Sequence, residues 1–428
     1  MRFSHDTLYT FLTRVALAAA ALLTGIIIAR VLEPAGRGAY SIAILVPVML
    51  YLVGNLGMGI ANVYFSSKKT QDVAAIAGNS IIFSLLASVI LFLIFIIFNG
   101  YFEPFFKGVS PFAVIIGLSA LPFYFIYNFF QSLLLGTNRI KEFNMLRLAE
   151  GFSLLFLLLI VLLLVKASVP AAIFCWWGSI VLPAVISIIL VKKQIGIKLA
   201  FNSGLFKESL GFGIKGYAAN LTQFFNYRLD TFLVNLFLDI VNVGFYSIAV
   251  SLAEILWFIP GSVATVLLPK SSASNEKENN RFTPLVLKTT FLITLVFAAV
   301  LYIGGSYFIG LFYTQKFMPA LPALLILIPG TLIFSVQTVL ASDLVGRGRP
   351  GINTIIAVIG LVVTIVLDVL LIPKYGIIGA AWASVFSYGT TSLITLFVFL
   401  RVSGVHLVSL LIFSKEELRQ FRTLTVKK

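Results

Sequence analysis

The chain has 428 residues, of which 60% are hydrophobic and 11% charged, and its mean hydropathy is +1.05. Soluble domains are about 45–50% apolar and about a quarter charged, which excludes a soluble enzyme, a disordered chain and a secreted disulfide scaffold. The formal net charge of +15 suits either a nucleic-acid partner or the basic cytoplasmic loops of a membrane protein. The positions of the Lys and Arg residues decide between these two explanations.

Apolar stretches long enough to cross a bilayer recur along the whole chain. About 20 helical residues span the roughly 30 Å of hydrocarbon, and backbone groups in lipid must bond within their own segment. We therefore predict an all-α polytopic membrane protein with twelve transmembrane helices. The predicted spans are residues 7–29, 40–65, 73–98, 111–135, 145–165, 169–191, 213–238, 243–268, 285–311, 320–344, 352–372 and 377–400.

The basic residues lie mostly on one side of these spans. Of the 31 Lys and Arg residues, 23 fall on the side of the two termini, 6 on the other side and 2 inside spans. Cytoplasmic loops collect Lys and Arg, so we predict a protein of the cytoplasmic membrane with both termini in the cytoplasm. The net charge then reports topology, and we expect no nucleic-acid partner.

The chain divides into two related halves. Residues 38–43 (GAYSIA) and 244–249 (GFYSIA) match at five of six positions, 206 residues apart, and Gln131 and Gln337 are separated by the same interval. Two parallel six-helix repeats around a central cavity explain both observations, and transporters place substrate sites at such repeat interfaces. The predicted parts are an N-terminal lobe (1–191), a cytoplasmic linker (192–212), a C-terminal lobe (213–400) and a cytoplasmic tail (401–428).

Residues for enzymatic or cofactor chemistry are scarce. Cys175 has no cysteine partner, and His5 and His406 lie near opposite ends of the chain. No GxxxxGK[ST] pattern is present, and the GxGxxG match at residues 346–351 falls in a basic turn that contains a proline. A nucleotide site would need a preceding strand and a following helix. We predict no cofactor, no metal site and no enzyme activity.

Several ionisable side chains lie inside predicted spans. An ionised group at the bilayer centre costs at least about 2.5–3.5 kcal/mol, so such residues usually face a cavity or a partner. Arg14 can either line a cavity or extend to the headgroups, and Glu254 can serve function or a buried hydrogen bond. Arg228 can face a cavity or neutralise a carboxylate between packed helices, and we expect Asp368 to lie at the interface.

The seventh span carries the most polar face. At 100° per residue, one arc of about 80° contains four of its polar side chains. Arg228 flanks that arc, which predicts a cavity-facing helix. The four residues are Asn220, Gln223, Tyr227 and Asp230.

Arg30 and Arg37 bracket the first outer loop, against the general distribution of charge, and Glu33 between them could pair with either. The charges of Arg14, Arg228, Asp230 and Glu254 sum to zero, so Arg30 and Arg37 tip the balance of the cavity to positive. Guanidinium groups stay charged and bind phosphate in bidentate fashion, so this balance favours an anionic ligand.

The stretch at residues 30–41 resembles the R-x-LGP-x-x-x-G-x-YS signature of polysaccharide-repeat flippases. These are the Wzx-like, O-antigen-type branch of the multidrug/oligosaccharidyl-lipid/polysaccharide exporter superfamily. Glu33 replaces the usual glycine before the proline. Residues 227–230, 243–247 and 377–383 are also similar to this family.

The resemblance implies a flippase that moves an undecaprenyl-diphosphate-linked oligosaccharide from the inner to the outer leaflet by alternating access. Its partners would be that lipid, the surrounding membrane lipids and polysaccharide assembly proteins, and we expect a monomer. Arg14 and Arg228 would bind the diphosphate, with Arg30 and Arg37 nearer the exit. Asp230 or Glu254 would bind H⁺ or Na⁺ as the coupling ion.

Three other functions stay open at this point. A multidrug cation exporter of the same superfamily would need a more anionic cavity. A flippase for peptidoglycan lipid precursors usually has fourteen spans. A membrane glycosyltransferase or polymerase needs a large loop outside the membrane, and the predicted outer loops are short.

Overall fold

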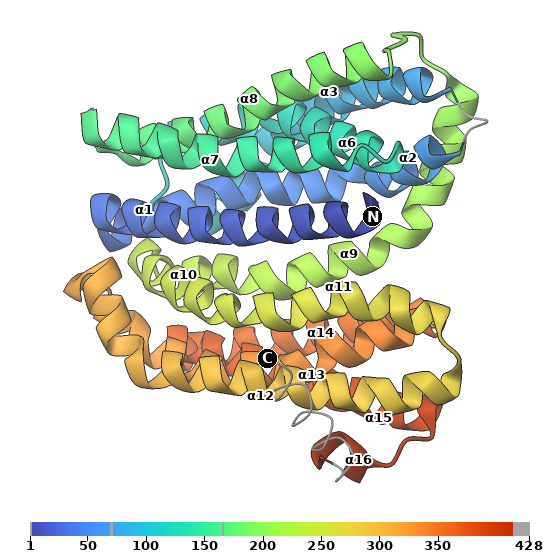
Figure 1. Cartoon of the computed structure of the whole chain (residues 1–428). Helices are drawn as coiled ribbons and strands as arrows, with labels where there is room; N and C mark the ends of the chain where they lie inside the picture. The colour runs from blue at the N-terminus through green and yellow to red at the C-terminus, as the bar shows by residue number, and fades with distance from the viewer. Residues whose placement is uncertain (1, 69–71, 165–166, 414–428) are drawn as a thin grey trace. The chain divides into compact units, whose positions relative to one another are not determined.

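The computed structural model describes residues 2–68, 72–164 and 167–413, and every regular element in these ranges is helical (Figure 1). The chain forms two compact units. Unit 1 comprises residues up to Leu221 together with Asp239–Gly244, and unit 2 comprises Thr222–Leu238 and the residues from Phe245 onward. The division falls inside helix α9 (Ser203–Phe237), so one continuous helix belongs to both units.

Unit 1 contains α1 (Arg2–Asn55), α2 (Met58–Ser67), α3 (Val73–Ile97), α4 (Asn99–Phe102), the 3₁₀ turn η1 (Glu103–Phe106), α5 (Pro111–Ser119), α6 (Leu121–Gly136), α7 (Ile140–Leu164), α8 (Val169–Gln194) and the start of α9. Unit 2 contains the rest of α9, most of α10 (Ile240–Glu254), the 3₁₀ turn η2 (Ile255–Trp257), α11 (Phe258–Ala273), α12 (Glu276–Phe308), the π-turn η3 (Ile309–Tyr313), the 3₁₀ segment η4 (Gln315–Ala320), α13 (Leu321–Gly346), α14 (Pro350–Tyr375), α15 (Ile377–Ser403) and α16 (Leu407–Leu411).

Helix α1 contains the first predicted span and residues 40–55 of the second, and the end of the second span forms the separate helix α2 after a break at Leu56 and Gly57. The helical geometry of α1 is interrupted only at Glu33, with φ 59° and ψ −179°, followed by Pro34. In Figure 1 the start of the chain and α2 lie at the same end of unit 1, so α1 turns back on itself at the kink. The predicted outer loop is therefore helical on both sides of a single residue. That residue occupies a backbone region almost restricted to glycine.

Ten helices of the described part are long and apolar enough to cross a membrane. The first, Leu12–Asn55, has 44 residues, or about 66 Å at 1.5 Å per residue, roughly twice the hydrocarbon thickness. Helix α9 is absent from the ten because the polar residues of the predicted seventh span lower its hydropathy. These two elements account for the difference from the predicted twelve spans.

The predicted inter-lobe linker 192–212 is mostly helical. Helix α8 continues to Gln194 and α9 begins at Ser203. Asn202 ties this connection to α3, because its backbone N–H donates to Asn79 Oδ1 at 2.9 Å while Asn79 Nδ2 donates to its carbonyl at 3.0 Å. The predicted tail begins as the last turn of α15 and continues into α16, and residues 414–428 lie outside the described ranges.

Each unit has its own apolar core. In unit 1, buried side chains of α2, α3, α6 and α8 pack together, and in unit 2 those of α11, α13, α15 and α16 do so. Several helices begin at a side chain that accepts a hydrogen bond from a backbone N–H of the first turn, which replaces a missing helical partner. These N-caps are Asp72, Ser110, Ser168 and Asn275.

The two repeat segments meet in unit 1. A Cβ built on Gly38 would lie 1.9 Å from the carbonyl oxygen of Ile240, and one on Gly244 would lie 2.0 Å from that of Pro34. Both obstacles are backbone atoms, so only glycine allows the turn between α9 and α10 to rest on α1. The repeated GxYS pattern therefore marks a backbone-to-backbone crossing.

Just before the start of α14, unit 2 contains a buried ion pair between Asp343 and Arg347. Arg347 Nε donates to Asp343 Oδ2, and the side chains are 5% and 0% exposed. Asp343 Oδ1 also accepts from the hydroxyls of Ser271 at 2.7 Å and Thr283 at 2.8 Å. These contacts connect α11, α12 and α13.

Candidate functional site

Unit 1 brings two arginines together. Arg14 of α1 and Arg147 of α7 are both half-buried, and they are close enough for their charges to interact. Within the described part of the chain, neither guanidinium forms a salt bridge. Glu150 interacts electrostatically with Arg147, but its Oε2 accepts a hydrogen bond from the Tyr127 hydroxyl at 2.6 Å. The local charge is therefore positive inside a mostly apolar bundle.

Arg30 and Arg37 lie on the two sides of the α1 kink. Arg30 is exposed and Arg37 is half-buried. Both have interaction partners in the structure, and the carbonyl of Arg37 accepts a hydrogen bond from the Ser41 hydroxyl at 3.0 Å. They are separate from the Arg14–Arg147 pair along α1, at the end where the chain reverses.

The polar face of α9 divides between different environments. Asn220 is exposed on the part of α9 that belongs to unit 1. Gln223 and Tyr227 belong to unit 2 and line a pocket there. Asn226, which flanks the polar arc of this helix, is buried and accepts a hydrogen bond from the Thr364 hydroxyl at 2.7 Å.

Arg228 forms a bidentate ion pair with Glu254, the last residue of α10. The Nη1–Oε1 and Nη2–Oε2 distances are 2.7 and 3.1 Å, and the two side chains are 36% and 22% exposed. The structure thus agrees with the interpretation in which Arg228 neutralises a carboxylate between packed helices. Both groups stay partly accessible, so the pair can exchange partners.

Asp230 lies in a buried cluster with residues of three other helices. Its Oδ2 accepts from the Tyr246 hydroxyl at 2.6 Å, and Tyr246 is also 3.3 Å from the Ser384 hydroxyl. Asp368 is completely buried and interacts electrostatically with Asp230. Neither oxygen of Asp368 has a hydrogen-bond partner among the described residues.

Asp368, which we expected near the membrane interface, is thus enclosed by protein, because α14 turns this side chain into the interior of unit 2. A buried carboxylate without a partner is unfavourable unless it is protonated or paired with a cation. The location of Asp368 inside a predicted span was the available sequence signal, since intramembrane acids usually mark functional sites.

A pocket of about 530 Å³ lies in unit 2 between α9, α11, α13 and α14. Its wall includes an aromatic group in which the Trp257 ring centroid lies 4.8 Å from that of Tyr227 and 5.3 Å from that of Phe334. Amides and hydroxyls complete the wall, including Gln337 and Asn353, and no lining residue carries a charge. The sequence-based predictions did not include Trp257 or Asn353.

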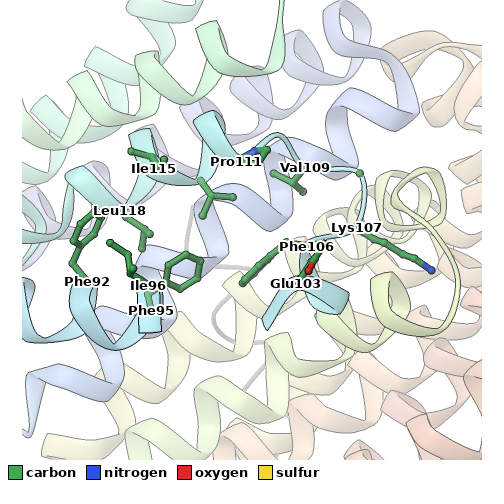
Figure 2. Close-up of a pocket in the computed structure, with 12 residues that line it drawn as sticks. Phe92, Phe95, Ile96, Glu103, Phe106, Lys107, Val109, Pro111, Ile115 and Leu118 are labelled. Carbon is green, nitrogen blue, oxygen red and sulfur yellow. The ribbon is translucent and has the colours of Figure 1, made fainter. Parts of the chain in front are cut away.

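A second pocket, of about 540 Å³, lies in unit 1 between the end of α3 and the start of α5. Figure 2 shows that its wall is mostly apolar, with side chains such as Phe95 and Leu118, and that Lys107 extends away from them. Its chemistry suits hydrocarbon rather than a sugar or a phosphate.

Comparison with known proteins places the chain in a family. Residues 27–322 match the family described as "Polysaccharide biosynthesis protein". An uncharacterized membrane protein of Methanocaldococcus jannaschii, MJ1068, is 30% identical over 71% of this chain, which spans 64% of that relative's length. The probable low-salt glycan biosynthesis flippase Agl15 of Haloferax volcanii is 23% identical over 41% of this chain and 38% of its own.

Solved structures share the fold. The lipid II flippase MurJ in an inward closed conformation has a TM-score of 0.80 at 20% identity, covering 99% of this chain and 93% of that one. An inward-facing multidrug resistance MATE family transporter of the MOP superfamily has a TM-score of 0.78 at 14% identity, covering 91% and 94%. The chain is thus a multi-pass helical membrane protein that belongs to the polysaccharide biosynthesis protein family.

Proposed function

We propose that this protein moves a polyprenyl-diphosphate-linked oligosaccharide from the inner to the outer leaflet of the cytoplasmic membrane for surface polysaccharide synthesis. Family membership supports transport in polysaccharide biosynthesis, and a relative is named as a probable glycan biosynthesis flippase. The observation that carries the proposal is the pair of half-buried arginines, Arg14 and Arg147, without a salt bridge in the described part of unit 1.

Two neighbouring guanidiniums in an apolar bundle repel each other, and an anion relieves that repulsion. A diphosphate suits them because guanidinium donates two parallel hydrogen bonds to phosphate oxygens. The long apolar tail of the substrate stays in the lipid and needs no pocket. Arg14 and Arg147 are therefore the proposed diphosphate ligands of unit 1, with Arg30 and Arg37 nearer the exit.

Arg228 is a proposed diphosphate ligand of unit 2. It is paired with Glu254 and would have to leave this partner to bind the ligand. A proton or a competing anion that displaces Glu254 would free a guanidinium that is already partly exposed. Asp230 and Asp368 are the better candidates for coupling to H⁺ or Na⁺. A carboxylate can take up a proton, and its oxygens can coordinate a hard cation. The carboxylate of Asp368 also lacks a hydrogen-bond partner among the described residues.

The transport cycle is proposed to use twelve membrane passes. Two of them come from Leu12–Asn55, hinged at Glu33, and one from α9, whose polar face would be protected from lipid by protein. The distribution of Lys and Arg then puts both termini in the cytoplasm. Cysteine labelling from each side of the membrane tests this topology.

The transport function can be tested in proteoliposomes that contain a fluorescent polyprenyl diphosphate oligosaccharide, with a membrane-impermeant quencher reporting its leaflet. Arg14→Ala and Arg147→Ala should each slow flipping about 10- to 100-fold, since a hydrogen bond to a charged group contributes about 1.5–3 kcal/mol. Arg14→Lys should recover only part of the rate because lysine keeps the charge without the planar geometry.

Arg401→Ala is the matched control, because Arg401 is an exposed arginine of α15 that packs over Phe397. It should leave the flipping rate unchanged. Normal flipping by both Arg14→Ala and Arg147→Ala would refute the proposed anion site. Transport of cationic dyes with no flipping of the lipid by the unmodified protein would refute the proposed function.

A further inference from the structure

We propose that the unit 2 pocket between α9, α11, α13 and α14 is a sugar subsite, which binds an uncharged hexose or N-acetylhexosamine of the transported glycan. This inference rests on the proposed function and adds the part of the substrate that unit 2 recognises. The volume of about 530 Å³ falls in the range of about 300–1,000 Å³ that is typical of small-ligand pockets.

The aromatic wall offers a surface for the apolar face of a sugar ring. Trp257, Tyr227 and Phe334 lie within 4.8–5.9 Å of one another between ring centroids. An aromatic face carries partial negative charge, and the C–H groups of a pyranose face carry partial positive charge, so the two surfaces attract. Trp257 is the last residue of the 3₁₀ turn η2, between α10 and α11.

The polar part of the wall contains unused donors and acceptors. Among the described residues, Trp257 Nε1, Gln337 Oε1 and Asn353 Oδ1 are buried without a hydrogen-bond partner. The Trp257 group is a donor and the two amide oxygens are acceptors. Sugar hydroxyls both donate and accept, so they can satisfy all three once these side chains turn toward the ligand.

The same chemistry disfavours two other ligands. A diphosphate would find no cationic side chain, because none of the lining residues is charged. An organic cation would be attracted by the aromatic faces, but it would leave the indole N–H of Trp257 without an acceptor. A neutral polyhydroxyl ligand therefore fits the wall better than either.

The internal repeat provides a comparison within the chain. Tyr51 stands 206 residues before Trp257, at the interval that relates the two halves. It is buried, and its hydroxyl accepts a hydrogen bond from Asn55 Nδ2 at 2.8 Å. The position is thus satisfied internally in unit 1 and unsatisfied in unit 2, which indicates a ligand role for unit 2 alone.

The test compares two lipids that differ only in the sugar. The purified full-length protein in nanodiscs is titrated with polyprenyl diphosphate and with polyprenyl-diphosphate N-acetylglucosamine. The unmodified protein should bind the sugar-bearing lipid at least about tenfold more tightly, as expected from two or three added hydrogen bonds and an aromatic contact. Trp257→Ala and Gln337→Ala should remove this difference and leave the affinity for the sugar-free lipid unchanged.

Two further variants separate binding from folding. Trp257→Phe keeps an aromatic face and loses the indole donor, so it should retain part of the difference. Trp382→Ala is the matched control, because Trp382 is an exposed tryptophan of α15 outside the pocket, and it should keep the full difference. Elution as a single monodisperse peak shows that each variant is folded.

The outcomes separate this inference from the proposed function. Equal affinity of the unmodified protein for both lipids, or a difference that survives in Trp257→Ala and Gln337→Ala, overturns the sugar subsite while the flippase function stands. Failure of both lipids to bind overturns the proposed function and the subsite together. Binding of tetraphenylphosphonium that depends on Trp257 assigns the pocket to cations and overturns the sugar assignment.

Discussion

Removal of the Asp343 carboxylate should destabilise unit 2 strongly. Asp343→Ala leaves Arg347, whose side chain is only 5% exposed, without its anion. Breaking a buried ion pair in this way typically costs about 3–5 kcal/mol. The hydroxyls of Ser271 and Thr283 also lose their shared acceptor.

The structure places the expected loss near the lower end of that range. Arg347 Nη2 still donates to Asn280 Oδ1 at 2.9 Å, and the guanidinium lies 5.5 Å from the ring centroid of Phe399. These contacts partly compensate the remaining charge, so we expect a loss of about 3 kcal/mol in the free energy of unfolding. Thermal unfolding of the purified protein, followed by circular dichroism, should show a midpoint lower by about 3 °C, since unfolding entropy is about 2.1 cal/mol/K per residue.

Two variants make the reasoning refutable. Lys198→Ala breaks the ion pair with Asp72, in which the Lys198 and Asp72 side chains are 65% and 47% exposed. This change should lower the free energy of unfolding by at most about 1 kcal/mol. Asp343→Leu combined with Arg347→Met replaces the buried pair by apolar groups, and it should recover most of the loss. Equal midpoints for Asp343→Ala and Lys198→Ala would show that burial does not control the contribution of these ion pairs.

Three more results are expected. Glu33→Gly should raise the unfolding midpoint, because a residue held at φ 59° and ψ −179° stores about 1–3 kcal/mol of strain; a lower midpoint would show that the contacts of the Glu33 side chain outweigh the strain. The hydrogen bond from Lys198 lowers the pKa of Asp72, so the small stabilising contribution of this carboxylate is present above its unfolded pKa and fades as pH falls below about 4. The difference in stability between the unmodified protein and Asp72→Asn should therefore vanish at low pH. A difference that grows toward low pH would contradict this sign. Gly244→Ala should slow flipping and lower the midpoint, because the new Cβ would meet the Pro34 carbonyl; an unchanged protein would show that this crossing yields easily.

Sequence patterns predicted the helices well where apolar length alone decides the outcome. The predicted spans 73–98, 169–191 and 377–400 correspond closely to Val73–Ile97, Val169–Gln194 and Ile377–Ser403. The patterns were less successful at 30–38, where a loop was expected. A single residue in an unusual backbone conformation reverses the chain there, and one-residue kinks leave no trace in hydropathy.

The candidate site was predictable only in its composition. Helical periodicity put Tyr227 and Asp230 on one face of the seventh span, but the structure separates their environments, because Tyr227 lines the pocket and Asp230 bonds to Tyr246. The pairing of Arg228 with Glu254 connects residues 26 positions apart. Whether two such side chains meet depends on how each helix is rotated about its axis and where the helices cross.

The sequence by itself determined the helical membrane class of the protein and its family, and it predicted most of the spans and two related halves. Those properties follow from the amount and spacing of apolar residues and from short motifs, which are local along the chain. Only the tertiary structure decided that the charges of Arg14 and Arg147 interact, that Asp368 is buried and interacts with Asp230, and that Trp257 lines a neutral pocket. These are contacts between distant helices, so packing fixes them and local patterns do not.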